Sequence, residues 1–336
     1  MGIKIGPLET RNRVFLAPMS GVTDEAFRMT AHENGAGLVV SEMVASEELV
    51  NARPDMMRRA LGASSLSPFV IQLAGREPHW MAEGVRVAEA MGAQVIDINM
   101  GCPAREVTGG LSGSALMRNL DHAEKLIEAT VQAATVPVTL KMRLGWDHNS
   151  LNAPELARRA ERQGVALITV HGRTRCQFYT GKADWAAISR VREATSLPLI
   201  ANGDGNSVAD AKEMLAKSGA DGVMIGRGAY GRPWWPGVIA EGLDPGSGRV
   251  EPGLAEEAAI VARHHERILE KHGHHHGNRM ARKHIGWAIS RLAERRLLSE
   301  EAASHWRAVL LRTDDNDAVR RGLRELYDTV QEKAAA

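Results

Sequence analysis

The chain has 336 residues, of which 44% are hydrophobic and 25% are charged, and its formal net charge is only +1 at neutral pH. This length exceeds one ordinary domain and predicts a large domain accompanied by a small one. The small net charge excludes a histone-like protein that binds nucleic acid through a global positive field, so any such binding must use local patches.

No apolar segment reaches the roughly 18 residues that a transmembrane helix needs, and no basic stretch with a long apolar run opens the sequence. We therefore expect a soluble, cytoplasmic protein without a membrane partner. The two cysteines, Cys102 and Cys176, are too few for a disulfide framework or a four-thiolate metal site. Any chemistry of Cys102 is expected to involve that thiol alone.

Short apolar runs alternate with amphipathic segments over the first 230 residues. The runs occupy 13–19, 38–44, 68–75, 95–101, 137–143, 166–172, 198–204 and 222–228. The segments between them carry apolar residues spaced by three and four, and several close with Gly. Eight such units predict a (β/α)8 TIM barrel, because near-continuous apolar strands must be covered on both faces. A doubly wound open sheet is the alternative.

The alternating pattern stops after Trp235, and residues 242–253 have the Gly and Pro density of an interdomain linker. From Leu254 the composition is rich in Ala, Glu, Arg and Leu at helical spacing, which predicts a small helical bundle. We therefore expect a barrel domain over 1–241, a linker over 242–253 and a helical domain over 254–336.

Polar residues stand at the ends of all eight predicted strands, where a TIM barrel carries its catalytic groups. Any one of them could simply finish a strand, but their coincidence at eight ends predicts an active site. They are Pro18, Met19 and Ser20; Glu42; Gln72; Asn99 and Cys102; Lys141 and Arg143; His171 and Arg173; Asn202, Gly203 and Asp204; and Gly226 and Arg227.

The loops after the seventh and eighth strands predict a phosphate site. The turns 202–207 and 225–232 are glycine-rich, so their backbone can approach a phosphate closely, and Arg227 can add charge-assisted hydrogen bonds. Gln72 offers a donor and an acceptor to the edge of a flavin ring, and Lys141 can stabilise negative charge on a reduced flavin. FMN meets both needs, although Lys141 could also be a buried lysine paired to a glutamate.

No dinucleotide-binding fingerprint of glycines follows a strand with an acidic residue about twenty positions on. NADPH or NADH is therefore expected only as a transient reductant.

The segment IDINMGCPAREVTGGLSGSALM, residues 96–117, resembles the signature of tRNA-dihydrouridine synthases, and of the bacterial B-type branch in particular. Further segments follow in the order of that family. They are LAPMSGVTDEAFR, VIQLAG, VTLKMRLGW, TVHGRTR, LIANGD and MIGRGAYGRPW in the barrel, and RKHIGW at 282–287 in the tail. The resemblance covers residues 13 to about 236 and part of the helical region.

By this resemblance, Cys102 is the general acid that gives a proton to carbon 5 of uridine while reduced FMN delivers hydride to carbon 6. A thiol with a reference pKa of about 8.5 is mostly protonated at neutral pH, which suits an acid. The alternative is a buried cysteine that acts as a small hydrophobic residue. Cys176 lies outside the matched pattern and is expected to be a bystander.

The resemblance also implies the binding residues. It makes Asn99 and Arg173 contacts of the uridine, whereas His171 could also be a satisfied core histidine. The implied FMN contacts are Pro18, Met19, Ser20, Gln72, Lys141, His171, Asn202, Gly203, Asp204, Gly226 and Arg227. Relatives often carry lysines after the Gly-Cys-Pro-Ala segment, where this chain has Arg105 and Glu106, so the way this loop meets tRNA is open.

A basic segment at 279–296, with six Arg or Lys and one Glu, is the candidate surface for tRNA, with Arg282 and Lys283 as contacts. A solvated helix with Trp287 in the bundle core is the alternative. Because a base must leave its stack to reach a flavin, the D-loop of tRNA is the expected target. A monomer without an obligate protein partner is expected.

His272 and His274–His276 lack a thiolate or carboxylate at ligand spacing, so no metal is expected. Two rival functions stay open. The first is a flavin enzyme that acts on a free pyrimidine, as dihydroorotate dehydrogenases do. The second is an RNA-binding or regulatory protein with a purely structural flavin, which would have no need to keep Cys102 and Lys141.

Overall fold

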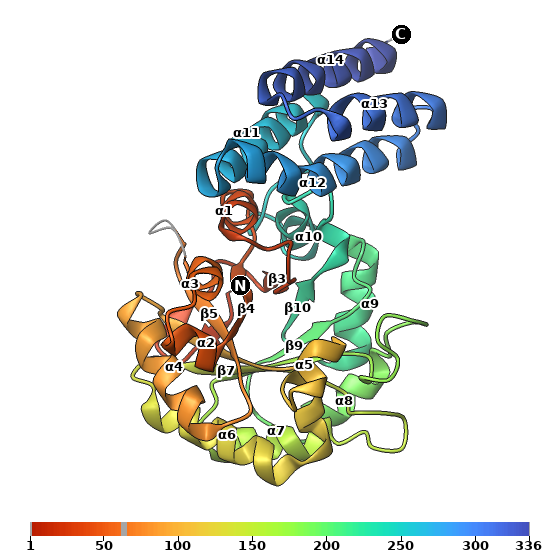
Figure 1. Ribbon diagram of the computed structural model, residues 1–336. Coiled ribbons are helices and arrows are strands. Elements are labelled where there is room, and N and C mark those ends of the chain that lie inside the picture. Colours follow the sequence, from red (N-terminus) through yellow and green to blue (C-terminus); the bar gives the residue numbers. More distant parts are fainter. Residues whose placement is uncertain (1, 62–65, 336) are drawn as a thin grey trace. The chain divides into compact units, whose positions relative to one another are not determined.

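A computed structural model describes residues 2–61 and 66–335, and its centre is a closed barrel of eight parallel strands in the order β10-β3-β4-β5-β6-β7-β8-β9 (Figure 1). Closure is direct, because β10 pairs with both β9 and β3. The strands are β3 (Val14–Leu16), β4 (Leu38–Ala45), β5 (Val70–Ala74), β6 (Val95–Met100), β7 (Val138–Arg143), β8 (Leu167–His171), β9 (Leu199–Asn202) and β10 (Gly222–Ile225). The predicted TIM barrel is confirmed, and the open sheet is wrong.

Helices cover the outside of the barrel, as Figure 1 shows for α4, α6, α7 and α8. Each predicted strand–helix unit has its helix. The helices of this part are α1 (Glu25–Glu33), α2 (Ser46–Val50), α3 (Pro54–Ala60), α4 (Pro78–Ala90), α5 (Arg105–Gly109), α6 (Leu120–Ala133), α7 (Ala153–Arg162), α8 (Ala186–Arg192), α9 (Val208–Ser218) and α10 (Trp235–Leu243), with 3₁₀ turns η1 (Gly113–Arg118) and η2 (Arg227–Ala229).

Local signals in the sequence explain where these helices begin and end. The Asp24 carboxylate accepts the N–H of Phe27 and caps α1, and the Ser207 hydroxyl does the same for Asp210 at α9. Helix α9 ends at Gly219, whose φ of +65° is a left-handed conformation that glycine adopts without strain. Such caps satisfy backbone groups that a helix end leaves without intrahelical partners.

The amino-terminal end of the barrel is filled with apolar side chains. A short hairpin, β1 (Lys4–Ile5) with β2 (Leu8–Glu9), brings Ile3 and Ile5 to this end. They join a buried cluster to which every barrel strand except β7 contributes a described member, including Phe15, Val40 and Met224. Because this end is a packed core, the opposite end, where the strands finish, is the one available for chemistry.

The chain divides into two compact units, and the second comprises Ala229–Trp235 and Val250–Ala336. Its helices are α11 (Leu254–His272), α12 (His274–Glu294), α13 (Glu300–Arg312) and α14 (Asn316–Ala335). The carboxylate of Glu257, 1% exposed, accepts the Tyr327 hydroxyl at 3.1 Å and pairs with Arg295 at 2.6 Å. None of the described helices is long and apolar enough to cross a membrane.

The first unit ends with residues 236–249, which include most of the predicted linker. Arg13 forms an ion pair with Asp244 at 2.7 Å, and the Asn12 side chain donates to the Ser247 carbonyl at 3.0 Å. Residues 244–247 are thus fastened to Asn12 and Arg13, directly before the start of β3. The domain boundary over 242–253 stays a prediction.

Candidate active site

The carboxyl ends of the parallel strands bring together the predicted polar residues, because neighbouring strands of one barrel finish at the same end. Asn99 of β6 is in register with Lys141 of β7, and His171 of β8 is in register with Asn202 of β9. Gln72 of β5 lies beside Asp97 of β6. The barrel therefore gathers side chains that lie far apart in the sequence.

A chain of hydrogen bonds runs through the barrel interior from Asp97 to the loop after β6. The Asp97 carboxylate accepts the Thr139 hydroxyl and the Gln72 amide N–H, each at 2.6 Å. Asn99 donates its amide N–H to Gln72 Oε1 at 2.7 Å, and Asn99 Oδ1 accepts the N–H of Cys102 at 2.9 Å. The carboxylate only accepts and the backbone N–H only donates, so the chain fixes both amides in one orientation.

The loop that carries Cys102 is held from three sides. Besides Asn99, the backbone N–H and the hydroxyl of Ser114 donate to the Cys102 carbonyl at 3.1 and 2.8 Å. Arg143 Nε donates to the Gly101 carbonyl at 2.8 Å, and its Nη1 reaches the carbonyls of Thr174 and Phe178. The thiol is therefore presented by a loop with little freedom to move.

Burial raises the pKa of the Cys102 thiol above its ordinary value, while a hydrogen bond from the Ala104 backbone and the charges of Arg143 and Lys141 act in the opposite direction. The thiol accordingly stays protonated throughout the neutral range. It is suited to give a proton and poorly suited to act as a nucleophile.

This protonation state can be measured by alkylation. In a Cys176→Ser background, which removes the exposed second thiol, we expect iodoacetamide to label Cys102 slowly at pH 7.5. The rate should rise about tenfold per pH unit until well above pH 8.5, because only the thiolate reacts and the pKa is raised. Mass spectrometry against a model thiol measures the profile. A midpoint below pH 8 would contradict a protonated acid.

Lys141 is a partly buried cation with spare hydrogen-bonding capacity. Its Nζ donates to Asn202 Oδ1 at 3.2 Å, and Asn202 in turn donates to the Met224 carbonyl at 2.7 Å. Burial lowers the pKa of Lys141 to about 8, with Arg143 adding repulsion and Asp97 opposing it. An ammonium group has three donors. Among the described residues it has one hydrogen-bond partner, so the site fits an acceptor such as the ring of a flavin.

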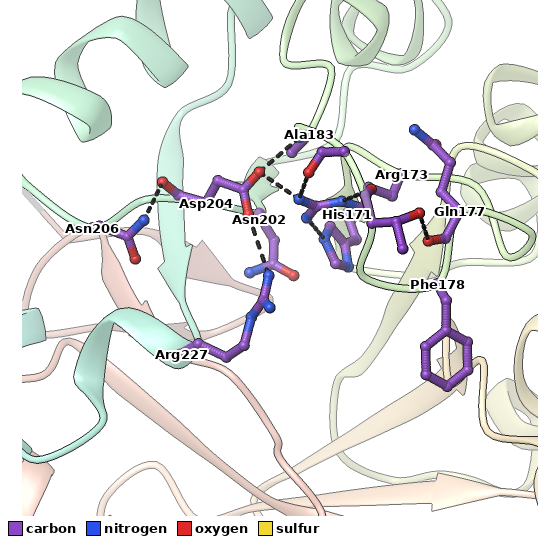
Figure 2. Close-up of polar contacts among 12 residues, drawn as sticks. His171, Arg173, Gln177, Phe178, Ala183, Asn202, Asp204, Asn206 and Arg227 are labelled. Atoms are coloured by element: carbon purple, nitrogen blue, oxygen red, sulfur yellow. Dashed lines mark hydrogen bonds and ion pairs between the residues drawn. The ribbon is translucent and has the colours of Figure 1, made fainter. Parts of the chain in front are cut away.

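Figure 2 shows Arg173 at the centre of a polar cluster formed by the loops after β8 and β9. Its guanidinium donates to Asp204 at 2.6 Å and to the carbonyls of Thr180 and Gly181, and it lies 3.2 Å from His171 Nε2. Arg173 is only 1% exposed. This geometry favours Arg173 as the support of the loop and of His171, so its uridine contact stays a prediction.

The predicted phosphate turns are adjacent in space. Arg227, about half exposed, reaches Asp204 Oδ1 at 3.4 Å, whereas Arg173 contacts the other oxygen of that carboxylate (Figure 2). Gly203 has a φ of +118°, and a Cβ there would lie 2.7 Å from the His171 ring, so this turn requires glycine. Burial, with the positive charges of Arg143, Lys141, Arg173 and Arg227, holds the pKa of His171 well below its ordinary value, so His171 is neutral.

The loop after β3 is the remaining part of the predicted cofactor site. Pro18 and Met19 are half-buried and Ser20 is exposed. The Met19 carbonyl accepts the N–H groups of Val22 and Thr23, which makes a tight turn. Met19 Sδ lies 3.7 Å from the position that a Cβ of Gly226 would take, so this turn adjoins the loop after β10.

The sequence analysis assigns no role to four residues of the site, and of these it names only Arg143, as a polar strand end. Asp97 and Thr139 anchor the amide chain, Ser114 holds the Cys102 loop, and Arg143 joins that loop to the one after β8. A charged residue inside an apolar strand was the available signal for Asp97. Arg143 stood out as a polar strand end without an assigned role.

The predicted tRNA contacts Arg282 and Lys283 lie on α12 of the helical unit. Arg282 pairs with Asp314 at 2.6 Å, and Lys283 is partly buried. Trp287 stacks on Tyr230, with ring centroids 4.0 Å apart and planes 12° apart. The described residues contain no group of three His, Cys, Asp or Glu that could hold a metal ion. Two positive charges of the segment 279–296, on Arg282 and Arg295, are paired with carboxylates outside it.

A family model described as dihydrouridine synthase (Dus) matches residues 15–329 of the chain. The chain belongs to the dihydrouridine synthase family. It is 58% identical over 286 residues to a probable tRNA-dihydrouridine synthase of Rhizobium leguminosarum bv. phaseoli, covering 85% of this chain and 88% of the relative. It is 49% identical to one of Rickettsia conorii, covering 98% of each chain. The predicted family is confirmed.

The B-type branch is represented among these relatives as well. The chain is 41% identical to tRNA-dihydrouridine synthase B of Xanthomonas axonopodis pv. citri, covering 98% of this chain and 96% of the relative. Among solved structures it resembles histamine dehydrogenase from Rhizobium sp. 4-9, with a TM-score of 0.52 and 15% identity over 72% of this chain. The chain spans about half the length of that protein, and the likeness supports the barrel fold alone.

Proposed function

We propose that the protein is a tRNA-dihydrouridine synthase that reduces the 5,6 double bond of a uridine in the D-loop of tRNA, with FMN as cofactor and NADPH or NADH as reductant. The observation that carries this proposal is the convergence of a partly buried, protonated thiol at Cys102 and a partly buried cation at Lys141 on one end of a barrel of this family. Relatives that match nearly the whole chain are named for this reaction.

The residues that would hold FMN surround Lys141. We assign its phosphate to the turns at Asn202–Asp204 and Gly226–Arg227, where glycine backbone and the Arg227 guanidinium can bind an anion. We assign its ring to Gln72, Lys141, His171 and the turn Pro18–Ser20. FMN, when bound, supplies hydride to carbon 6 of the uridine, and NADPH or NADH restores its electrons between turnovers.

The protein's own groups govern the proton. Cys102 holds a proton on its thiol and gives it to carbon 5, so one hydride and one proton together saturate the double bond. Asn99 keeps the Cys102 loop in place through Oδ1, which accepts the N–H groups of Gly101 and Cys102, and the uridine contact assigned to Asn99 can use the second N–H of its amide, since only one donates to Gln72. Neutral His171 adds no positive charge beside Lys141 and so avoids repelling it.

We place the remaining tRNA contacts, including Arg282 and Lys283, on the helical unit, over 254–336. The enzyme is proposed to act in the cytoplasm, where its substrate occurs, as a monomer without an obligate protein partner. A base that stacks in the D-loop must be turned out to reach the barrel, which favours a flexible loop over a paired stem.

The test is a direct one. FMN-loaded protein and NADPH are incubated with an unmodified tRNA transcript and with native tRNA that lacks dihydrouridine, and the products are mapped by mass spectrometry. Dihydrouridine at a D-loop position is the expected result. The proposal would be overturned if NADPH reduced the flavin and the protein reduced a free pyrimidine, but both kinds of tRNA stayed unmodified.

A further inference from the structure

Two arginines face one tryptophan on the rim of the barrel, in a cluster that the proposed reaction does not use. The guanidinium carbons of Arg118 and Arg175 lie 4.9 and 4.8 Å from the ring centroid of Trp146. Arg118 is exposed, whereas Arg175 and Trp146 are partly buried. A cation over an aromatic face is stabilised by the quadrupole of the ring, so the tryptophan holds two positive charges close together.

The three segments that carry this cluster are fastened to one another. The N–H groups of Arg175 and Cys176 donate to the carbonyls of Gly145 and Trp146 at 3.0 and 2.8 Å, which joins the loops after β7 and β8. The Asn152 side chain donates to the Met117 carbonyl at 2.7 Å, which ties η1 to the loop after β7. The two guanidinium groups are thus preorganised by the backbone as well as by the ring.

The cluster adjoins the loop that carries the catalytic thiol. Ser114, which binds the Cys102 carbonyl, lies in the same 3₁₀ turn as Arg118, four residues away and so about 8 Å along that turn. Arg175 Nη2 donates to the Thr108 hydroxyl at 3.2 Å, on the short helix α5 that follows Cys102. Each arginine is therefore connected to a segment that follows Cys102 in the chain, Arg118 as part of η1 and Arg175 by its hydrogen bond to α5.

These two arginines differ from most surface arginines of the barrel in having no acidic partner. Within the described residues, neither Arg118 nor Arg175 forms an ion pair, and Arg175 Nε is buried without a hydrogen-bond partner. By contrast, Arg86 pairs with Glu83, and Arg158 pairs with Glu155. Keeping two like charges together without a carboxylate is unfavourable unless an anion binds them.

We propose that Arg118, Trp146 and Arg175 bind the phosphates of the tRNA nucleotides that flank the target uridine. The inference rests on the proposed function, because it takes the substrate to be RNA and the reacting base to meet Cys102. Phosphate contacts fix the register of a nucleic acid without reading its sequence, and guanidinium groups suit phosphate geometry. The cluster would set which nucleotide stands over the thiol, while the FMN site is left untouched.

The experiment measures the affinity of FMN-loaded protein for unmodified tRNA across a salt series, with Arg118→Gln/Arg175→Gln against wild type. Each phosphate contact that is lost should lower the slope of log affinity against log salt by about one. We expect the magnitude of this slope to fall by about two and tRNA binding at 0.1 M salt to weaken by roughly tenfold. Reduction of the bound flavin by NADPH in the absence of RNA should be unchanged.

Matched variants separate this role from net charge and from folding. Arg86→Gln/Arg158→Gln removes the same charge from paired surface arginines and should leave the slope unchanged, whereas Arg118→Lys/Arg175→Lys keeps the charge and should retain it. An unchanged slope in Arg118→Gln/Arg175→Gln overturns the inference and leaves the proposed function intact. A wild-type protein that neither binds nor modifies tRNA removes the proposed function and this inference together.

Discussion

Cys102→Ala is expected to lower dihydrouridine formation by about 10²- to 10⁴-fold, the range in which a positioned general acid contributes to catalysis. The reason is that the methyl group cannot deliver a proton to carbon 5, whereas the loop around it, bound by Asn99 and Ser114, keeps its backbone contacts. Single-turnover formation of dihydrouridine under limiting reductant measures the effect.

Two controls accompany this variant. Cys176→Ala removes the other, exposed thiol and should leave the rate unchanged. Reduction of the flavin by NADPH should also stay at the wild-type rate in Cys102→Ala, because the thiol acts only on the uridine. Wild-type dihydrouridine formation by Cys102→Ala would show that another group supplies the proton.

The second large effect is expected from Lys141→Met, which removes the partly buried cation but keeps an unbranched side chain. Losing one preorganised electrostatic contact in an active site costs about 10² to 10³ in rate. We expect a loss of about that size in kcat for dihydrouridine formation, with weaker binding of FMN. Titration of the apoprotein by flavin fluorescence and steady-state kinetics provide the two measurements.

The pH dependence of FMN binding follows from the pKa of Lys141, which burial lowers to about 8. Below pH 8 Lys141 carries its charge in the free protein, and the charge is lost as the pH rises through 8. A flavin that needs this cation should therefore bind less tightly above pH 8, and Lys141→Met should lack this decline. Lys217→Met, on an exposed lysine paired with Glu213, is the matched control. Affinity that is flat through pH 9.5 in the wild type would contradict the role given to Lys141.

The barrel could be predicted from the sequence because each strand is a run of apolar residues that must be buried on both faces. All eight runs correspond to barrel strands, with observed bounds differing by up to three residues, as for β3 and β10. The hairpin β1–β2 was not predicted. Its strands are two residues long, and so short a pairing leaves no periodic signal.

The site was predictable only in part, because its residues are positioned by contacts between distant segments. The predicted strand ends do meet, but the sequence could not indicate that Asn99 is engaged by Gln72 or that Arg173 is enclosed by Thr180, Gly181 and Asp204. Charge counting on 279–296 likewise could not indicate that two of its arginines are paired with carboxylates. The carboxylates that neutralise Arg282 and Arg295, Asp314 and Glu257, lie outside the segment.

The most direct test of the account is an anaerobic single-turnover experiment with enzyme whose FMN has been reduced by one equivalent of NADPH. Addition of unmodified tRNA should reoxidise the flavin and produce one dihydrouridine per flavin, at a D-loop position, whereas free uridine or UMP at the same concentration should leave the flavin reduced. Reoxidation by the free pyrimidine, with none by tRNA, would contradict the central claim that this barrel acts on tRNA.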